Sequence, residues 1–271
     1  MATLAREGRN YLMRFFHFVG AKTMSIINNL GGIVIFFALA FLKIFHRKQP
    51  REIIQQVFYI GAKSSNIVML VGLFTGMVLG LQLYYTLTKV GSAGFLGSVV
   101  ALTLIRELGP VLTAIMITAR AGSAMTAEIG NLRISEQIDA LYTMRIDPQR
   151  YLVSPCIAAS IISFPLLTAL FDLIGIIGGY LTGVVLLGVD KGAYFYRIHS
   201  YVDMVDIRGG FIKSLVFAVL VSTICCYQGY FTHLRTDSYG ARSVNLSTTS
   251  AVVFSCVAIL ISDYVVTSFL M

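Results

Sequence analysis

Long stretches with few or no charged side chains dominate the pattern of this 271-residue chain. Each stretch reaches or exceeds the ~20 apolar residues that cross a bilayer as an α-helix. None alternates apolar and polar residues over about ten positions, as a membrane β-strand does. We therefore predict an all-α integral membrane protein with about five transmembrane helices, at residues 64–87, 95–119, 152–189, 209–231 and 246–271.

The third stretch is long for a single crossing. At a rise of ~1.5 Å per residue, a helix over residues 152–189 would exceed a hydrocarbon core of ~30 Å. It therefore spans either once, as a long tilted helix, or twice, as a hairpin. Glycines recur every fourth residue in this stretch and in the first, at Gly175, Gly179 and Gly183 and at Gly72, Gly76 and Gly80. Such small-residue faces predict close helix contacts, either within the chain or across a dimer.

The N-terminal residues 1–50 form a separate segment, followed by a transmembrane domain of residues 51–271. Basic residues mix with large apolar ones before residue 24, which predicts an amphipathic helix lying on a membrane surface. The apolar piece at residues 33–45 is short for a span. If it crossed, the basic residues on its two sides would be divided between the two faces of the membrane, so the positive-inside tendency favours an interfacial or re-entrant helix.

A polar interruption at residues 120–150 separates the second and third apolar stretches. Apolar residues at helical spacing lie in it beside two acidic residues, namely Ile134, Ile138 and Leu141 beside Glu136 and Asp139. This pattern is typical of an amphipathic helix. We predict a short helix at about residues 131–144.

Composition and charge agree with a membrane protein and suggest its orientation. The chain is 56% hydrophobic and 13% charged, whereas soluble domains carry about 25% charged residues. Its mean hydropathy is +0.79. Placing residues 1–63, 120–150 and 232–245 in the cytoplasm puts 15 of the 21 Lys and Arg there, which predicts a cytoplasmic N-terminus. The net charge of +8 fits anionic lipid headgroups, and a nucleic-acid partner is excluded for so apolar a chain.

Five ionisable residues interrupt the apolar stretches: Arg106, Glu107, Asp172, Lys213 and Asp263. Charged groups inside a membrane are costly and usually have a partner in the protein interior or a wet cavity. Arg106 and Glu107 are adjacent and point about 100° apart on a helix, so each needs a partner elsewhere. Lys213 and Asp263 carry charges of the sign that such partners need. A structural ion-pair network, the lining of a path for an amphipathic substrate and a proton relay all remain open.

No motif for nucleotide or metal chemistry accompanies these charges. The sequence contains neither a phosphate-binding Gly-x-x-x-x-Gly-Lys loop nor HExxH nor Cys-x-x-Cys, and no nucleophile–base set is evident. The four cysteines lie in apolar stretches and suggest neither metal nor disulfide. We therefore expect a transporter subunit and not an enzyme, without a cofactor in this chain; any ATP would be bound by another subunit.

Residues 102–159 carry the series RELGPVLTA, RAGSAMTAEIG and SEQIDAL. This series resembles the MlaE/YrbE-type permeases, the membrane subunits of MCE-associated lipid ABC transporters. The resemblance continues through residues 212–218, 227–230 and 262–271. The resemblance covers roughly residues 55–271. In the N-terminal fifty residues it extends only to their basic, amphipathic character.

The resemblance implies a homodimeric permease, multi-pass in the inner membrane of a Gram-negative bacterium. A cytoplasmic ATP-binding subunit would hold ATP and Mg and drive transport, often with a STAS-domain subunit beside it. A hexameric ring of MCE-domain protein would cap the periplasmic side. The substrate would be a glycerophospholipid, moved between the inner membrane and periplasmic MCE carriers that maintain outer-membrane lipid asymmetry.

The resemblance also implies roles for particular residues. The family's intramembrane charges, on the substrate path, match Arg106, Glu107, Lys213 and Asp263, whereas Asp172 matches no family feature. The family's coupling helix, which contacts the ATPase, falls on Ile134, Glu136, Gln137, Ile138, Asp139 and Leu141. Two rival functions are an ATP-independent secondary transporter with Glu107 and Asp263 as proton sites, and a membrane scaffold for an MCE protein. The direction of transport and the lipid headgroup are left open.

Overall fold

The computed structural model of the chain describes residues 50–234 and 240–270, together with residues 20, 24, 31–32, 34–39 and 42. No β-strand occurs among these residues. Short 3₁₀ or π segments, labelled η, join or interrupt the helices. The elements are α2 (Pro50–Val57), η1 (Phe58–Ala62), α3 (Lys63–Lys89), η2 (Ala93–Phe95), α4 (Leu96–Thr103), η3 (Leu104–Leu108), α5 (Gly109–Ile117), η4 (Thr118–Gly122), α6 (Ser123–Ile134), α7 (Gln137–Thr143), η5 (Gln149–Val153), α8 (Ser154–Tyr180), η6 (Leu181–Leu186), α9 (Lys191–Tyr201), α10 (Met204–Tyr230), η7 (Thr232–Leu234) and α11 (Ala241–Leu270).

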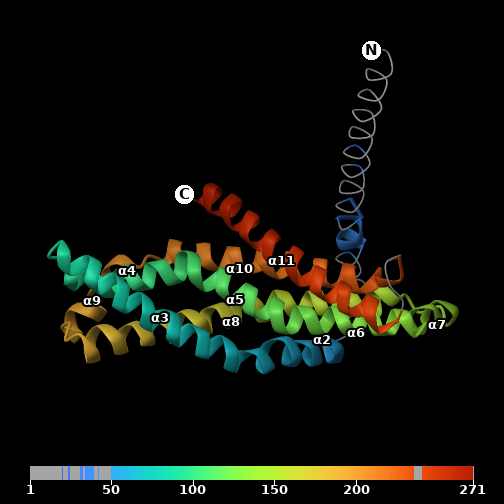
Figure 1. Cartoon of the computed structure of the whole chain (residues 1–271), viewed down its shortest axis with the longest axis horizontal. Helices are drawn as coiled ribbons and strands as arrows, with labels where there is room; N and C mark the ends of the chain where they lie inside the picture. Colours follow the sequence, from blue (N-terminus) through green and yellow to red (C-terminus); the bar gives the residue numbers. More distant parts are fainter. Residues whose placement is uncertain are drawn as a thin grey trace, which may run out of the picture.

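Five continuous helices in the described part are long and apolar enough to span a membrane: Pro50–Lys89, Ala93–Ile134, Gln149–Leu186, Met204–Tyr230 and Ala241–Leu270. They confirm the predicted all-α architecture. They lie side by side along one axis, with α7 at one end of the bundle and α9 at the other (Figure 1). We call these the α7 end and the α9 end. The third helix runs unbroken through α8 and η6, so this stretch spans once and the hairpin alternative is wrong.

Three predicted boundaries differ from the structure. The first spanning helix begins at Pro50 and not at residue 64, and the second continues through residues 120–134, which were predicted to lie in the polar interruption after the span. Polar side chains do not end a helix that extends beyond the hydrocarbon into water, because the backbone hydrogen bonds continue there. The amphipathic helix begins at Gln137, because Glu136 takes a left-handed conformation with φ 57°. Ile134 therefore ends α6 and is not part of α7.

The predicted N-terminal interfacial segment lies mostly outside the described residues. Residues 34–39 are helical. Phe36 is buried against an aromatic cluster where α10 ends, with ring centroids 5.6–6.0 Å from those of Tyr227, Tyr230 and Phe231. This piece of the segment therefore docks at the α7 end of the bundle.

The glycine faces of the first and third spans pack against each other within the chain. Gly76 lies against Gly175 so closely that a Cβ on Gly76 would overlap the Gly175 carbonyl oxygen. A Cβ on Gly80 would lie 3.2 Å from the carbonyl oxygen of Gly179. The small-residue spacing therefore builds an internal α3–α8 contact and is not a dimer seam.

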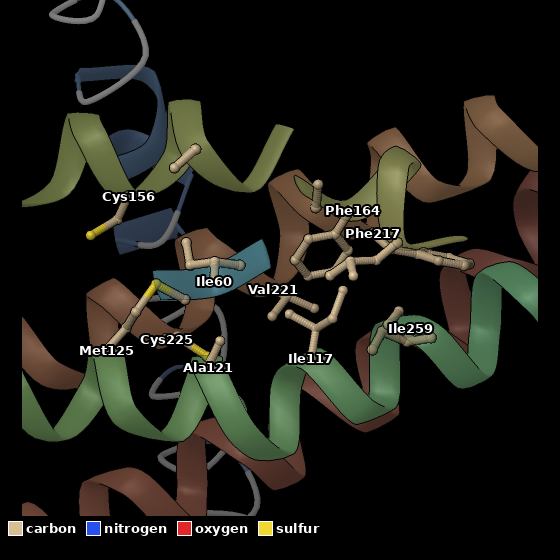
Figure 2. Close-up of a cluster of buried hydrophobic side chains, with 14 of the residues drawn as sticks. Ile60, Ile117, Ala121, Met125, Cys156, Phe164, Phe217, Val221, Cys225 and Ile259 are labelled. Carbon is tan, nitrogen blue, oxygen red and sulfur yellow. The ribbon is translucent and has the colours of Figure 1, made fainter. Parts of the chain in front are cut away.

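The core is centred on α10. In the most apolar part of α10, 61% of the residues are buried, whereas in the most apolar part of α11 only 11% are buried. Phe217, Val221 and Cys225 of α10 meet side chains of the second and third spans in the cluster drawn in Figure 2. The helix α11 runs obliquely to the other helices (Figure 1) and contacts them along one face, which includes Asp263 and Thr267 near its C-terminal end, while most of its remaining surface is uncovered. Its apolar side chains are consequently exposed to lipid or to another chain.

Candidate functional site

A break in the helical hydrogen-bond ladder sits beside the intramembrane charges. Pro110 has no N–H, so it cannot donate to the carbonyl oxygen of Arg106 four residues earlier. The chain forms the π turn η3 here, and Lys213 of α10 donates from Nζ to the Arg106 carbonyl oxygen at 2.9 Å. Single π turns inside helices are frequent at functional sites. The proline thus creates the acceptor that brings Lys213 to this turn.

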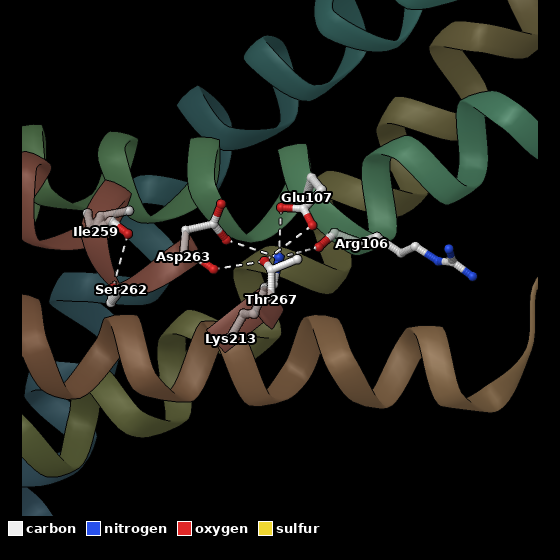
Figure 3. Close-up of polar contacts among 7 residues, drawn as sticks. All are labelled: Arg106, Glu107, Lys213, Ile259, Ser262, Asp263 and Thr267. Carbon is white, nitrogen blue, oxygen red and sulfur yellow. Dashed lines mark hydrogen bonds and ion pairs between the residues drawn. The ribbon is translucent and has the colours of Figure 1, made fainter. Parts of the chain in front are cut away.

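Lys213 lies between two carboxylates from other helices. Its Nζ is 2.7 Å from Glu107 Oε2 and 3.0 Å from Asp263 Oδ1, and its side chain is only 3% exposed. Figure 3 shows the ammonium at the centre of these contacts. A lysine buried this deeply needs such partners, because burying an unpaired charge costs far more than burying a paired one. We call Lys213, Glu107 and Asp263 the Lys213 network.

Thr267 joins the Lys213 network from α11. Its hydroxyl donates to the Asp263 carbonyl oxygen at 2.8 Å and lies 3.4 Å from Glu107 Oε1. The carboxylate of Glu107 therefore faces an ammonium on one oxygen and a hydroxyl on the other. Through these contacts α10 and α11 are both fixed to the π turn of the second span.

Arg106 has a partner that the sequence analysis did not identify. Its Nε and Nη2 both lie 2.7 Å from Asp206 Oδ1. The prediction that Lys213 and Asp263 would serve Arg106 and Glu107 is therefore right for Glu107 and wrong for Arg106. Being next to Glu107 on a helix, Arg106 points away from the Lys213 network (Figure 3).

Asp206 was overlooked because it lies in a polar stretch between two apolar ones. It is the third residue of α10 and forms a capping box with Asp203, whose backbone N–H donates to Asp206 Oδ2 at 3.2 Å. The sequence does carry a signal: Asp206 precedes Lys213 by seven residues, or two helical turns, so both lie on one face of α10.

A cavity of about 210 Å³ adjoins these charges at the α9 end. Its lining combines the charged residues Arg106, Glu107, Asp206 and Lys213 with the apolar residues Val205 and Leu270. The side chain of Arg106 is 46% exposed, so its guanidinium is accessible to a ligand. The cavity therefore combines an anion-binding group with apolar walls, as an amphipathic molecule requires.

Asp172 is not part of the Lys213 network. It lines a second cavity of about 220 Å³, apolar in character, between α8 and α10. Its Oδ1 is buried, contacts the backbone of Gly109 and forms no hydrogen bond within the described part of the chain. The structure places this carboxyl group beside the π turn, without an ionic partner among the described residues.

The residues predicted to couple to an ATPase divide into two groups. Ile134, Glu136, Gln137 and Asp139 are exposed at the α7 end, and Leu141 is partly buried. Ile138 is fully buried in the core of its own chain. It therefore anchors α7 and does not present a side chain to a partner.

Comparison with known proteins gives a consistent result. The family model described as Permease MlaE matches residues 53–269. The chain is 39% identical to the "Intermembrane phospholipid transport system permease protein MlaE" of Haemophilus influenzae, over 95% of this chain and 97% of the relative. It is also 39% identical to the "Probable ABC transporter permease protein RP096" of Rickettsia prowazekii, over 94% of this chain and 97% of the relative.

Proposed function

Because the chain belongs to the MlaE permease family, whose members serve lipid transport as ABC permeases, we propose that it moves glycerophospholipids between the inner membrane and periplasmic MCE carriers. This exchange would maintain the lipid asymmetry of the outer membrane. The chain is a multi-pass inner-membrane protein; in the proposal the α7 end and the N-terminus face the cytoplasm, so the α9 end faces the periplasm.

The observation that carries the proposal is the charged cavity at the α9 end. Asp206 accepts from two nitrogens of Arg106 with one oxygen, which leaves further N–H donors of the guanidinium for a lipid phosphate. Val205 and Leu270 provide apolar surface beside it for the start of the acyl chains. One amphipathic lipid thus meets both kinds of surface.

The partners follow from the same proposal. Two copies of the chain form a homodimer, for which the exposed face of α11 is available. A separate cytoplasmic subunit binds ATP and Mg and grips α7 through its exposed residues, with a STAS-domain subunit beside it. A hexamer of MCE-domain protein receives or delivers lipid at the α9 end.

Replacing Arg106 by glutamine is expected to lower phospholipid transfer about ten-fold or more, because the group that binds the phosphate loses its charge. The measurement is ATP-dependent transfer of phospholipid between proteoliposomes containing the permease with its ATPase and acceptor MCE protein. Arg208→Gln is the matched control, because Arg208 is exposed on the first turns of α10 and does not line the cavity.

Wild-type transfer by both Arg106→Gln and Glu107→Gln would remove the substrate-path assignment. Transfer by the wild-type permease without any ATPase would support the secondary transporter instead. Assembly with the MCE protein, but neither lipid transfer nor lipid-stimulated ATP hydrolysis, would support the scaffold.

A further inference from the structure

Side chains at the α7 end tie α7 to the last turn of α10. Arg133, at the end of α6, places Nη1 2.7 Å from Asp139 Oδ1 of α7. Its Nε donates to Nδ1 of His233 at 2.9 Å, just beyond α10, and its guanidinium lies 5.7 Å from the centre of the Tyr230 ring. One arginine thus joins α6, α7 and the end of α10.

The imidazole of His233 accepts this bond in its neutral form, because only an unprotonated ring nitrogen has a lone pair. Partial burial, together with the positive charge of Arg133, lowers the pKa of His233 from its usual value. The neutral imidazole therefore persists at neutral pH, and the Arg133–His233 contact persists with it.

A second tie runs directly from α7 to α10. The hydroxyl oxygens of Tyr142 and Tyr230 are 2.6 Å apart, a short hydrogen bond. Tyr142 is 53% exposed on α7, whereas Tyr230, the last residue of α10, is 5% exposed. A side chain accessible to a partner is therefore bonded to one fixed in the core.

The backbone on either side of α7 bends sharply. Glu136 and Arg145 both have φ 57°, and no other non-glycine residue among those described has a positive φ. A left-handed conformation is unfavourable for residues with a side chain and allows the chain to reverse over one position. The helix α7 lies between two such bends. Its side-chain contacts with Tyr230 and Arg133 therefore connect it to the bundle in addition to the backbone.

The helix on the other side of these contacts, α10, has no break along its length, a property that it shares with α11 among the spanning helices described. The first three spans contain π turns, and α8 also contains Pro165, whereas α10 runs from Met204 to Tyr230 without interruption. Lys213 and Tyr230 are separated along it by about 26 Å at ~1.5 Å per residue. A shift or rotation at Tyr230 would therefore be passed to Lys213 and not absorbed at a break.

We propose that the Tyr142–Tyr230 hydrogen bond clamps α7 to α10, supported by Arg133, which binds Asp139 of α7 and contacts Tyr230 and His233, and that α10 transmits the displacement of α7 to the Lys213 network. The inference rests on the proposed function, because an ATPase has to move α7. It assigns Tyr142, Tyr230, Arg133 and His233 as positioning residues that link ATP hydrolysis to lipid movement. None of them contacts the cavity at the α9 end.

The test is the number of phospholipids transferred per ATP hydrolysed, measured in proteoliposomes with the full complex for Tyr142→Phe, Tyr230→Phe and the double variant. Phenylalanine keeps the ring and removes only the hydroxyl. Each single variant is expected to keep its ATPase rate and lower this ratio about three- to ten-fold, as the loss of one hydrogen bond allows. The double variant is expected to match the singles, because both remove the same contact. Tyr151→Phe is the control, since its hydroxyl makes no hydrogen bond to any described residue.

An unchanged ratio in both single variants would overturn the clamp, as would additive losses in the double variant. Equal losses in Tyr151→Phe would overturn it as well, because the effect would then follow from removing any hydroxyl at this end. Absence of lipid transfer by the wild-type complex would instead contradict the proposed function. The two failures are therefore distinguishable in one set of measurements.

Discussion

Replacing Lys213 by methionine is expected to destabilise the protein by about 3 kcal/mol and to abolish phospholipid transfer. The substitution leaves Glu107 and Asp263 facing each other without a cation, and the Arg106 carbonyl oxygen without its donor. This loss of stability lies at the lower end of the range for breaking a buried ion pair, because the Glu107 side chain is 38% exposed. Thermal unfolding in detergent, with transfer in proteoliposomes, measures the two effects.

A triple variant separates charge from structure. Adding Glu107→Gln and Asp263→Asn to Lys213→Met removes the uncompensated carboxylates, so most of the lost stability is expected to return. Lys191→Met is the control for the loss of a lysine, because Lys191 is exposed at the start of α9. An unfolding temperature of Lys213→Met equal to that of the wild type would contradict the buried-pair interpretation.

The same triple variant decides whether the intramembrane charges take part in transport or serve the structure alone. A stable triple variant without transfer would mean that the charges take part in moving the lipid along its path. A stable triple variant with normal transfer would mean that they serve assembly alone. Stability and transfer therefore have to be measured on the same samples.

The five spans could be predicted from the sequence because the thickness of the bilayer fixes the length of an apolar helix. Their ends could not be predicted. Pro50 begins the first helix well before its apolar part, and the second continues past Arg120 into polar sequence. Arg120 there donates from Nη1 to the Tyr59 carbonyl oxygen and to Ser64 Oγ, so it is a packing residue and not a loop residue.

The site could be predicted in part, because a buried charge needs a partner of opposite sign and the apolar stretches contain few candidates. That argument finds Lys213 as the partner of Glu107, but it offers Asp263 to Arg106, whereas Asp263 pairs with Lys213. It fails for Arg106, since Asp206 is separated from it by 100 residues and lies in a polar stretch. Tyr142 and Tyr230 are uncharged, so an argument from buried charges does not find them. Only the packing of α7 on α10 brings their hydroxyls together.

Replacing Gly76 by alanine is expected to destabilise the protein by about 1–3 kcal/mol, the usual cost of overpacking a core. The added Cβ would overlap the carbonyl oxygen of Gly175, which is backbone and cannot rotate away as a side chain can. The helices α3 and α8 would have to separate along the whole glycine face, since Gly80 also contacts Gly179. Thermal unfolding of the purified protein in detergent gives the size of the effect.

Gly94→Ala is the matched control, because no atom lies within 4 Å of the position that its Cβ would take. It makes the same chemical change at the α9 end and is expected to leave the unfolding temperature unchanged. If Gly76→Ala were as stable as Gly94→Ala but less dimeric in detergent, the glycine face would be a contact between copies, and the internal α3–α8 packing would be wrong. Loss of stability without any change in the oligomeric state is the result expected from a seam within one chain.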